Sequence, residues 1–285
     1  MDQKRNNDGV TRRRIGLIAG QGRLPVMIAR GIRRAGHEVC CVGLRDQFDD
    51  DLEDACDYFA VAGIVRLGRW QRLLNRWGAD EAILCGRVKK SKMYEPLKWI
   101  RQTPDWKALY LWYVKLRHDR RSQQIHCAIA DEMQKKGIIL VDSTQYIQED
   151  LAKLGVMGKQ QPTRGQLSDI QLGWPILEAI SGLDVGQAVA MMNADIIAVE
   201  AVEGTDKMIM RAGELCRIKG WSLLKNARTN HDLRFDVPTV GIRTIEKLYE
   251  AGGRCLAVGA GKVILAEQAL MLARADALGV AVVGV

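Results

Sequence analysis

The chain has 285 residues, of which 47% are hydrophobic, and a formal net charge of +8. This length supports two domains with ordinary cores, and no apolar run reaches about 18 residues, so no transmembrane helix is expected. The positive charge favours polyanionic partners, namely nucleic acid, an anionic membrane face or phosphorylated substrates, without choosing among them.

Residues 1–14 are polar and basic and lack the apolar stretch of a secretory signal, so we expect a disordered basic tail. The seven cysteines form no CxxC pair, and the four histidines have no metal-ligand spacing. Most cysteines sit in apolar runs. This pattern favours buried thiols in a reducing cytoplasm over a disulfide framework or a zinc site.

Short apolar runs alternate with helical patterns over residues 15–154. Such alternation is typical of a parallel sheet with helices on both faces, so an N-terminal Rossmann-like domain is predicted. Strands are expected at 15–20, 38–44, 58–65, 81–88 and 138–142, and helices from Pro25, over 70–77 and over 122–136.

Gly20 and Gly22 follow the first predicted strand and precede the helix that Pro25 opens. At this edge of a parallel sheet, glycines let the backbone approach a phosphate, and the helix N-terminus offers N–H groups. An ordinary tight turn is the alternative interpretation. Pro25 stands where a dinucleotide fingerprint has its third glycine, which argues against a nicotinamide enzyme.

Basic and aromatic residues interleave over residues 87–121, and Leu109, Trp112, Tyr113 and Leu116 fall on one helical face. The segment fits a helix that buries its apolar face, a contact with a membrane surface or acyl chains, or a nucleic-acid-binding element. No recognised nucleic-acid-binding fold accompanies it, so no nucleic-acid partner is expected.

A connection is predicted over residues 155–164, followed by a C-terminal α/β domain over 165–285. Ser168 and Asp169 are expected to cap its first helix. The remaining elements are strands at 187–192 and 196–201 joined as a hairpin, a helix after Asp206, strands at 256–258 and 263–265 around the turn Gly259–Lys262, a helix over 266–277 and a strand over 280–285.

Two carboxylates, Glu203 and Asp206, lie between the second strand of this hairpin and the next helix. They are candidate ligands for a metal ion or contacts for a substrate at the strand terminus. The alternative is that Thr205 or Asp206 only provides the N-cap of the helix.

Asp236 stands on a predicted turn between Arg234 and Pro238. Pro238 cannot donate to a central sheet, so a strand ends here or lies at an edge. A carboxylate near the cations Lys225, Arg228 and Arg234 is what a metal-dependent phosphate site needs. The simpler interpretation is that Asp236 starts a turn, with Arg234 as its surface partner.

Three segments resemble motifs of one family, in the family's order. Residues 198–206 are similar to AVEAxEGTD, residues 225–241 to KxxKPxQxxRxDxPxIG, and residues 15–25 to GLIAGxGxLP. These motifs are those of the LpxI family, the UDP-2,3-diacylglucosamine pyrophosphatases of lipid A synthesis. Thr229 and His231 depart from the family's usual proline and glutamine.

The resemblance implies a cytoplasmic hydrolase that converts UDP-2,3-diacylglucosamine to 2,3-diacylglucosamine 1-phosphate (lipid X) and UMP with magnesium. With many carboxylates and no His/Cys cluster, the sequence likewise favours Mg²⁺ or Mn²⁺ over zinc. The expected site lies between the two domains. Asp236 would bind the ion or orient the water, and Glu203 and Asp206 would contribute further ligands.

Cations would neutralise the phosphates in this interpretation: Lys225, Arg228 and Arg234 from one segment, and Lys262 as a minor contact. Gly20, Gly22 and Thr205 would hold polar parts of the substrate. A binding protein for a nucleotide-linked lipid and a hydrolase of another nucleoside diphosphate conjugate are the alternatives. The sequence leaves open whether the chain forms a homodimer or meets the inner membrane peripherally.

Overall fold

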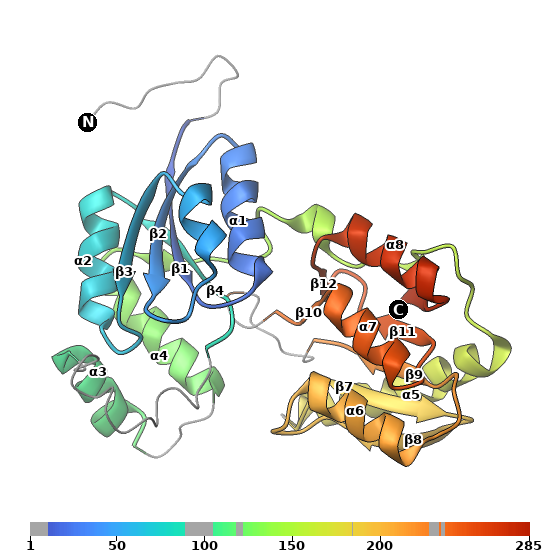
Figure 1. The fold of residues 1–285 in the computed structure, drawn as a ribbon. Coiled ribbons are helices and arrows are strands. Elements are labelled where there is room, and N and C mark those ends of the chain that lie inside the picture. Colours follow the sequence, from blue (N-terminus) through green and yellow to red (C-terminus); the bar gives the residue numbers. More distant parts are fainter. Residues whose placement is uncertain (1–10, 89–104, 118–121, 184, 228–233, 235–236) are drawn as a thin grey trace. The chain divides into compact units, whose positions relative to one another are not determined.

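A computed structural model describes residues 11–88, 105–117, 122–183, 185–227, 234 and 237–285. The chain forms two compact units: the first comprises the residues up to Ile147 together with Arg234, and the second comprises the other described residues from Gln148 onward. Each unit has its own sheet and its own core (Figure 1). In the described ranges, no helix combines the length and hydrophobicity needed to cross a bilayer.

The first unit is built on a five-stranded parallel sheet in the order β3-β2-β1-β4-β5. The order reverses beside β1, as in doubly wound nucleotide-binding folds, which confirms the predicted Rossmann-like class. Its strands are β1 (Arg14–Ala19), β2 (Glu38–Leu44), β3 (Tyr58–Ala62), β4 (Glu81–Cys85) and β5 (Ile139–Leu140).

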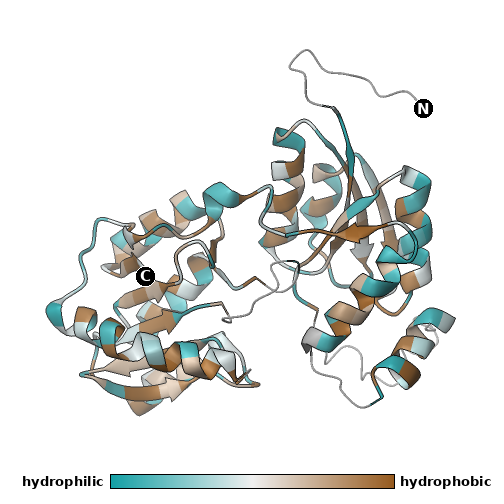
Figure 2. Cartoon of the chain, turned by 180° about the vertical axis from the view of Figure 1, so that it is seen from behind, coloured by the Kyte–Doolittle hydropathy of each residue, from teal (hydrophilic) through white to brown (hydrophobic). Residues whose placement is uncertain are grey.

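Helices flank this sheet and turn their hydrophobic sides towards it (Figure 2). Trp70 and Leu74 of α2 lie one helical turn apart and are both buried, so one face of α2 covers the sheet. The helices are α1 (Arg23–Arg34), the 3₁₀ helix η1 (Asp50–Ala55), α2 (Leu67–Trp77), α3 (Trp106–Tyr110), the π-helix η4 (Leu111–Lys115) and α4 (Ser122–Gln134).

The second unit contains a six-stranded mixed sheet in the order β6-β13-β11-β9-β7-β8 and a separate parallel pair, β10-β12. Strands β9, β11 and β13 are parallel, whereas β7 runs antiparallel to both of its neighbours. The strands are β6 (Gly155–Val156), β7 (Ala188–Met192), β8 (Asp195–Val199), β9 (Ser222–Lys225), β10 (Thr239–Val240), β11 (Cys255–Val258), β12 (Ile264–Leu265) and β13 (Ala281–Gly284).

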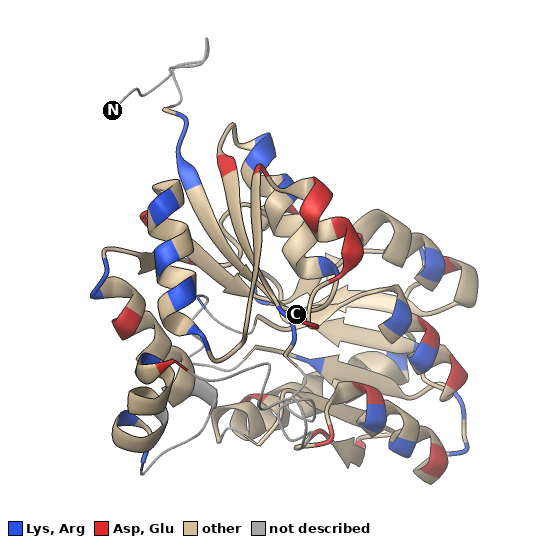
Figure 3. Cartoon of the chain, turned by 60° about the vertical axis from the view of Figure 1, so that its left-hand side comes forward, with Lys and Arg blue, Asp and Glu red and all other residues tan. Residues whose placement is uncertain are grey.

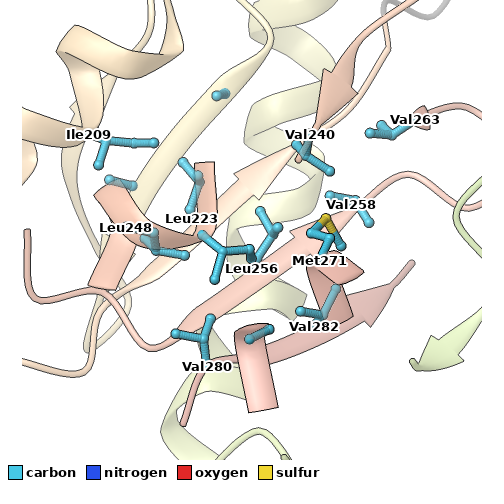
Figure 4. Close-up of a cluster of buried hydrophobic side chains, with 14 of the residues drawn as sticks. Ile209, Leu223, Val240, Leu248, Leu256, Val258, Val263, Met271, Val280 and Val282 are labelled. Carbon is cyan, nitrogen blue, oxygen red and sulfur yellow. The ribbon is translucent and has the colours of Figure 1, made fainter. Parts of the chain in front are cut away.

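Both faces of this sheet are buried, so β7, β11 and β13 are apolar throughout rather than alternating with polar residues, whereas β9 carries Ser222 and Lys225 at its two ends. Leu256 and Val258 of β11 join one cluster (Figure 4), and Cys255 and Ala257 join the other. Helix α5 (Arg164–Gly182) packs on the face that carries Cys255 and Ala257. The face that carries Leu256 and Val258 is covered by α6 (Thr205–Leu215), α7 (Ile242–Glu250) and α8 (Gln268–Leu278). A 3₁₀ helix, η5 (Gln148–Asp150), begins the unit.

The predicted hairpin is confirmed: β7 and β8 pair antiparallel around Asn193 and Ala194. Both turn residues have positive φ, 54° and 66°, which is the geometry that keeps two twisted strands paired through a two-residue turn.

The expected connection over residues 155–164 begins with the short strand β6, which pairs antiparallel with β13. The predicted cap at Ser168 and Asp169 is wrong. Helix α5 begins one turn earlier with a capping box between Thr163 and Gln166, and Asp169 is a buried residue inside the helix. Its carboxylate accepts a hydrogen bond from the Ala194 N–H at 2.7 Å, so it anchors the hairpin turn.

Candidate functional site

Three strands of the second unit end at the same edge of their sheet. Strands β8 and β9 both run antiparallel to β7, and β11 is parallel to β9, so their carboxyl ends coincide. Lys225 is the last residue of β9, and the residues that follow the three ends are Glu200, Asn226 and Gly259. In open α/β sheets, ligands bind beyond this edge.

A chain of hydrogen bonds joins Lys225, Thr205 and Glu200, which we call the Lys225 cluster. The Lys225 Nζ donates to Thr205 Oγ1 at 3.0 Å, and Thr205 Oγ1 donates to Glu200 Oε1 at 2.9 Å. An ammonium can only donate and a carboxylate can only accept, so the direction of the Thr205 hydroxyl is fixed. Two residues predicted for the site, Lys225 and Thr205, are therefore in direct contact.

The two charged members of the cluster are almost completely buried. Glu200 is 6% exposed and Lys225 is 7% exposed, although charged side chains are rarely buried unless they are paired. The Lys225 ammonium also lies 3.5 Å from the Thr239 carbonyl oxygen at the start of β10. Glu200 Oε2 is buried with no hydrogen-bond partner in the described part of the chain. Holding such groups in an apolar unit is costly, so the position has a purpose beyond packing.

Helix α6 begins directly beside the Lys225 cluster. Its N-cap is Gly204, with φ of 83°, and Thr205 is its first residue, so neither Thr205 nor Asp206 is the cap that the sequence suggested. No atom lies within 4 Å of the position that a Gly204 side chain would occupy. The first-turn N–H groups of a helix have no partner within the helix and favour anions. The Lys225 cluster therefore lies at a position suited to a phosphate.

The two other predicted carboxylates are engaged with cations. Glu203 forms an ion pair with Arg211 at 2.6 Å, and Asp206 forms one with Lys247. Hydrogen bonds from its own backbone N–H and from Arg211 lower the pKa of Glu203. No group of three or more His, Cys, Asp or Glu residues suited to a metal ion occurs in the described ranges. Their role as metal ligands stays a prediction.

The remaining site residues predicted from the C-terminal half of the sequence are placed only in part. Asp236 and Arg228 lie outside the described residues, and Arg234 is a half-buried turn residue that groups with the first unit. Lys262 is exposed in the turn between β11 and β12. This turn starts at the cluster, because the Gly259 N–H donates to the Lys225 carbonyl at 3.1 Å.

The loop after β1 has clear structural reasons for its glycines. A side chain on Gly20 would lie 2.8 Å from the Arg87 carbonyl oxygen, because the loop pairs with the chain after β4. Gly22 is the N-cap of α1 and has φ of 107°, and its N–H donates to an Asp49 carboxylate oxygen at 3.4 Å. These contacts fit the tight-turn interpretation, and substrate contact by Gly20 and Gly22 stays a prediction.

Glu200 and Asn226 were not singled out from the sequence. Asn226 is 2% exposed, and its Oδ1 accepts from the Ala227 N–H at 2.9 Å while lying 2.2 Å from the position of a side chain on Gly259. Only glycine fits at 259 for this reason. The available signal for Glu200 was its place in the same motif as Glu203, three residues earlier; the predicted strand 196–201 included Glu200, whereas β8 ends at Val199.

Comparisons with known proteins agree with these motifs. A model described as the LpxI N-terminal domain matches residues 14–150, and one described as the LpxI C-terminal domain matches residues 153–283. The UDP-2,3-diacylglucosamine pyrophosphatase LpxI of Caulobacter vibrioides is 28% identical over 281 residues, which cover 96% of this chain and 98% of that protein.

Similarity to solved structures is much weaker. A glycinamide-RNase-transformylase T from Mycobacterium tuberculosis is 13% identical with a TM-score of 0.25 and covers 67% of this chain and 44% of its own. A nucleoside-diphosphate-sugar epimerase from Pseudomonas aeruginosa is 16% identical with a TM-score of 0.26 and covers 62% of each chain. With TM-scores this low, neither similarity informs the fold of this chain. Because the two family models together span nearly the whole sequence, the chain belongs to the LpxI family.

Proposed function

We propose that this chain hydrolyses the pyrophosphate of UDP-2,3-diacylglucosamine to 2,3-diacylglucosamine 1-phosphate and UMP in lipid A synthesis. Membership of the LpxI family and the name of the Caulobacter relative support the reaction. The structural observation that carries the proposal is the 3.0 Å contact between Lys225 and Thr205, which joins two of the family-like motifs at one strand edge.

A pyrophosphate repels an attacking water until its negative charge is balanced. In this proposal the Lys225 ammonium balances part of that charge together with the first-turn N–H groups of α6. The Thr205 hydroxyl donates to Glu200, so it orients the ammonium and does not itself donate to the phosphate. Burial of Lys225 removes competing water and strengthens its interaction with an anion.

Magnesium or manganese dependence is part of the proposal. A divalent cation would neutralise further phosphate oxygens. Glu203 and Asp206 already pair with Arg211 and Lys247, so the described carboxylates alone do not form a ligand set for it. We therefore propose Asp236 as the principal ligand of the ion. Arg228, Arg234 and Lys262 remain proposed phosphate contacts.

The two alternatives differ in what they release and accept. A binding protein for a nucleotide-linked lipid would bind the substrate without releasing UMP. A hydrolase of another nucleoside diphosphate conjugate would release UMP equally well from an unacylated UDP-sugar. We also propose that the chain is cytoplasmic, contacts the inner membrane peripherally and forms a homodimer.

The test uses the full chain with UDP-2,3-diacylglucosamine and an unacylated UDP-sugar, and measures UMP release. We expect turnover of the acylated substrate and a loss of roughly 10²-fold or more in Lys225→Met, as for a lost charge contact to a transition state. Lys219→Met, on a basic residue of the same unit outside the cluster, is the matched control. Equal turnover in Lys225→Met and Lys219→Met would overturn the assignment of Lys225.

A further inference from the structure

The helical segment α3–η4 of the first unit presents an aromatic face to solvent. Trp106 is 86% exposed, Tyr110 51%, Tyr113 62% and Val114 57%. Tyr110 follows Trp106 by four residues, and Tyr113 and Val114 follow Tyr110 by three and four, which places all of them on one side of a helix. Large apolar side chains exposed together, rather than singly, mark a surface that meets another phase or partner.

A π-turn explains why this face points outward. The Leu116 N–H donates to the Leu111 carbonyl at 2.9 Å, a bond across five residues. It brings Leu111 and Leu116 to the same side, where both are 5% exposed and join the core of the unit. Tyr113 and Leu116, which were expected on one helical face, therefore differ in exposure: Tyr113 is exposed and Leu116 is buried. A π-turn costs hydrogen-bond geometry and is often found at functional sites.

Helix α2 carries a stripe of arginines next to this segment. Arg69, Arg72 and Arg76 recur at i, i+3 and i+7, and the helix contains no acidic residue (Figure 3). Arg72 and Arg76 are exposed and Arg69 is half-buried. The buried residues Trp70 and Leu74 lie on the opposite side of α2, so the stripe faces away from the sheet.

The two elements are fixed to each other. The Gly68 N–H of α2 donates to Asp105 Oδ2 at 2.6 Å, and Asp105 also caps α3 by accepting from Ala108 N–H at 2.9 Å. Lys107 forms a hydrogen bond with Gln71. The exposed residues of α3–η4 and the arginine stripe of α2 thus belong to one rigid region, which we call the aromatic–arginine surface.

We propose that the aromatic–arginine surface docks on an anionic phospholipid bilayer. Tyrosine and tryptophan prefer the boundary between headgroups and acyl chains, and guanidinium groups attract anionic headgroups. A basic stripe with no acidic residue on its own helix, beside exposed rings, satisfies both requirements at once. Val114 adds apolar area that a bilayer can cover but a nucleic-acid base cannot stack on, which favours lipid over nucleic acid.

Membrane docking would serve the proposed reaction. Only this connection between docking and turnover rests on the proposed function. A diacylated substrate resides in a membrane and its hydrolysis leaves a diacylated product. Docking would hold the enzyme where substrate is concentrated, without changing the chemistry at the Lys225 cluster. Loss of docking should therefore reduce turnover of substrate in vesicles and leave turnover of detergent-dispersed substrate unchanged.

Vesicle flotation tests the surface directly, with vesicles of phosphatidylcholine alone or mixed with phosphatidylglycerol. The wild-type chain should float only with the anionic vesicles and be released by salt. Arg72→Glu/Arg76→Glu should bind at least about tenfold more weakly, since each basic residue contributes to attraction at the membrane. Arg30→Glu/Arg33→Glu on α1 changes the net charge equally and should bind like wild type.

The aromatic side is tested separately by Trp106→Ser/Tyr113→Ser, with Leu215→Ser/Ile218→Ser in the second unit as the control. The control residues are comparably exposed, at 64% and 66%. The aromatic variant should also lose flotation, and circular dichroism should show that it stays folded. Flotation equal to wild type in either surface variant overturns the proposal.

Two further outcomes are decisive. If a single-stranded oligonucleotide displaces the chain from vesicles and binds more tightly than they do, the surface is a nucleic-acid site and the proposal is overturned. If the chain floats as expected but releases no UMP from any UDP-sugar, the proposed function fails and the docking surface stands, so the two failures are distinguishable.

Discussion

Replacing Thr205 by valine should destabilise the second unit, because it keeps the size of the side chain and removes the hydroxyl that links Lys225 and Glu200. Each of the two lost hydrogen bonds involves a charged group, and such bonds contribute roughly 1.5–3 kcal/mol. Both partners are more than nine-tenths buried, so water cannot replace the hydroxyl freely.

The full loss of two such bonds is an upper limit. Lys225 Nζ and Glu200 Oε1 lie within 3.0 Å of the same oxygen, so they can move towards each other and recover part of the energy as an ion pair. We therefore expect a decrease of about 2–3 kcal/mol in the free energy of unfolding. Thr205→Ser retains the hydroxyl and should cost less than about 1 kcal/mol.

Urea unfolding monitored by hydrogen exchange, resolved by peptide, is the appropriate assay because the chain has two units. Peptides that contain β9 and β11 should lose protection in Thr205→Val, while peptides of β1 and β2 should keep theirs. A change below about 0.5 kcal/mol, or equal changes in the valine and serine variants, would refute the inference that the hydroxyl supports two buried charges.

Three other predictions follow from the site and the core. Asp236→Ala should abolish UMP release with unchanged circular dichroism; wild-type turnover would remove Asp236 from the site. EDTA should stop the reaction and added Mg²⁺ or Mn²⁺ should restore it, whereas full activity in EDTA would argue against a metal. Burial raises the pKa of Cys40 and of Cys255 to about 12 from an ordinary 9.0, so both should resist alkylation in the folded chain. Their contribution to stability is complete below pH 9 and decreases as the pH rises towards 12, which denaturant titrations would detect.

Much of the fold could be predicted because its signals are local. The range 38–44 was expected as a strand and is β2 with the same bounds, since a continuous apolar run bounded by polar residues determines it. The start of α5 was misplaced although Thr163 and Gln166 form a readable capping box. Ser168 and Asp169 offered a competing cap, and only the contact of Asp169 with the hairpin turn, 25 residues away, shows its actual role.

The candidate site could be predicted only in part, because it depends on contacts between residues far apart in the sequence. Lys225 and Thr205 were singled out one at a time, but their contact depends on which strand neighbours which. Placing β9 between β11 and β7 is a long-range property of the sheet that no local pattern states. The difference in exposure between Tyr113 and Leu116 was hidden for a similar reason, since a helical period of 3.6 residues cannot anticipate the π-turn.

Glu200 shows most clearly how the sheet changes the meaning of a residue. In the sequence, Glu200 and Glu203 are two carboxylates of one motif, and either could contact a metal ion or a substrate. In the structure Glu203 pairs with Arg211 near solvent, whereas Glu200 is held at the strand end beneath Thr205. A carboxylate in that place fixes the direction of the hydroxyl that orients Lys225. In the proposed reaction Glu200 would therefore act on a phosphate only through Lys225, as a positioning residue, and its substitution by glutamine should weaken UMP release less than Lys225→Met does.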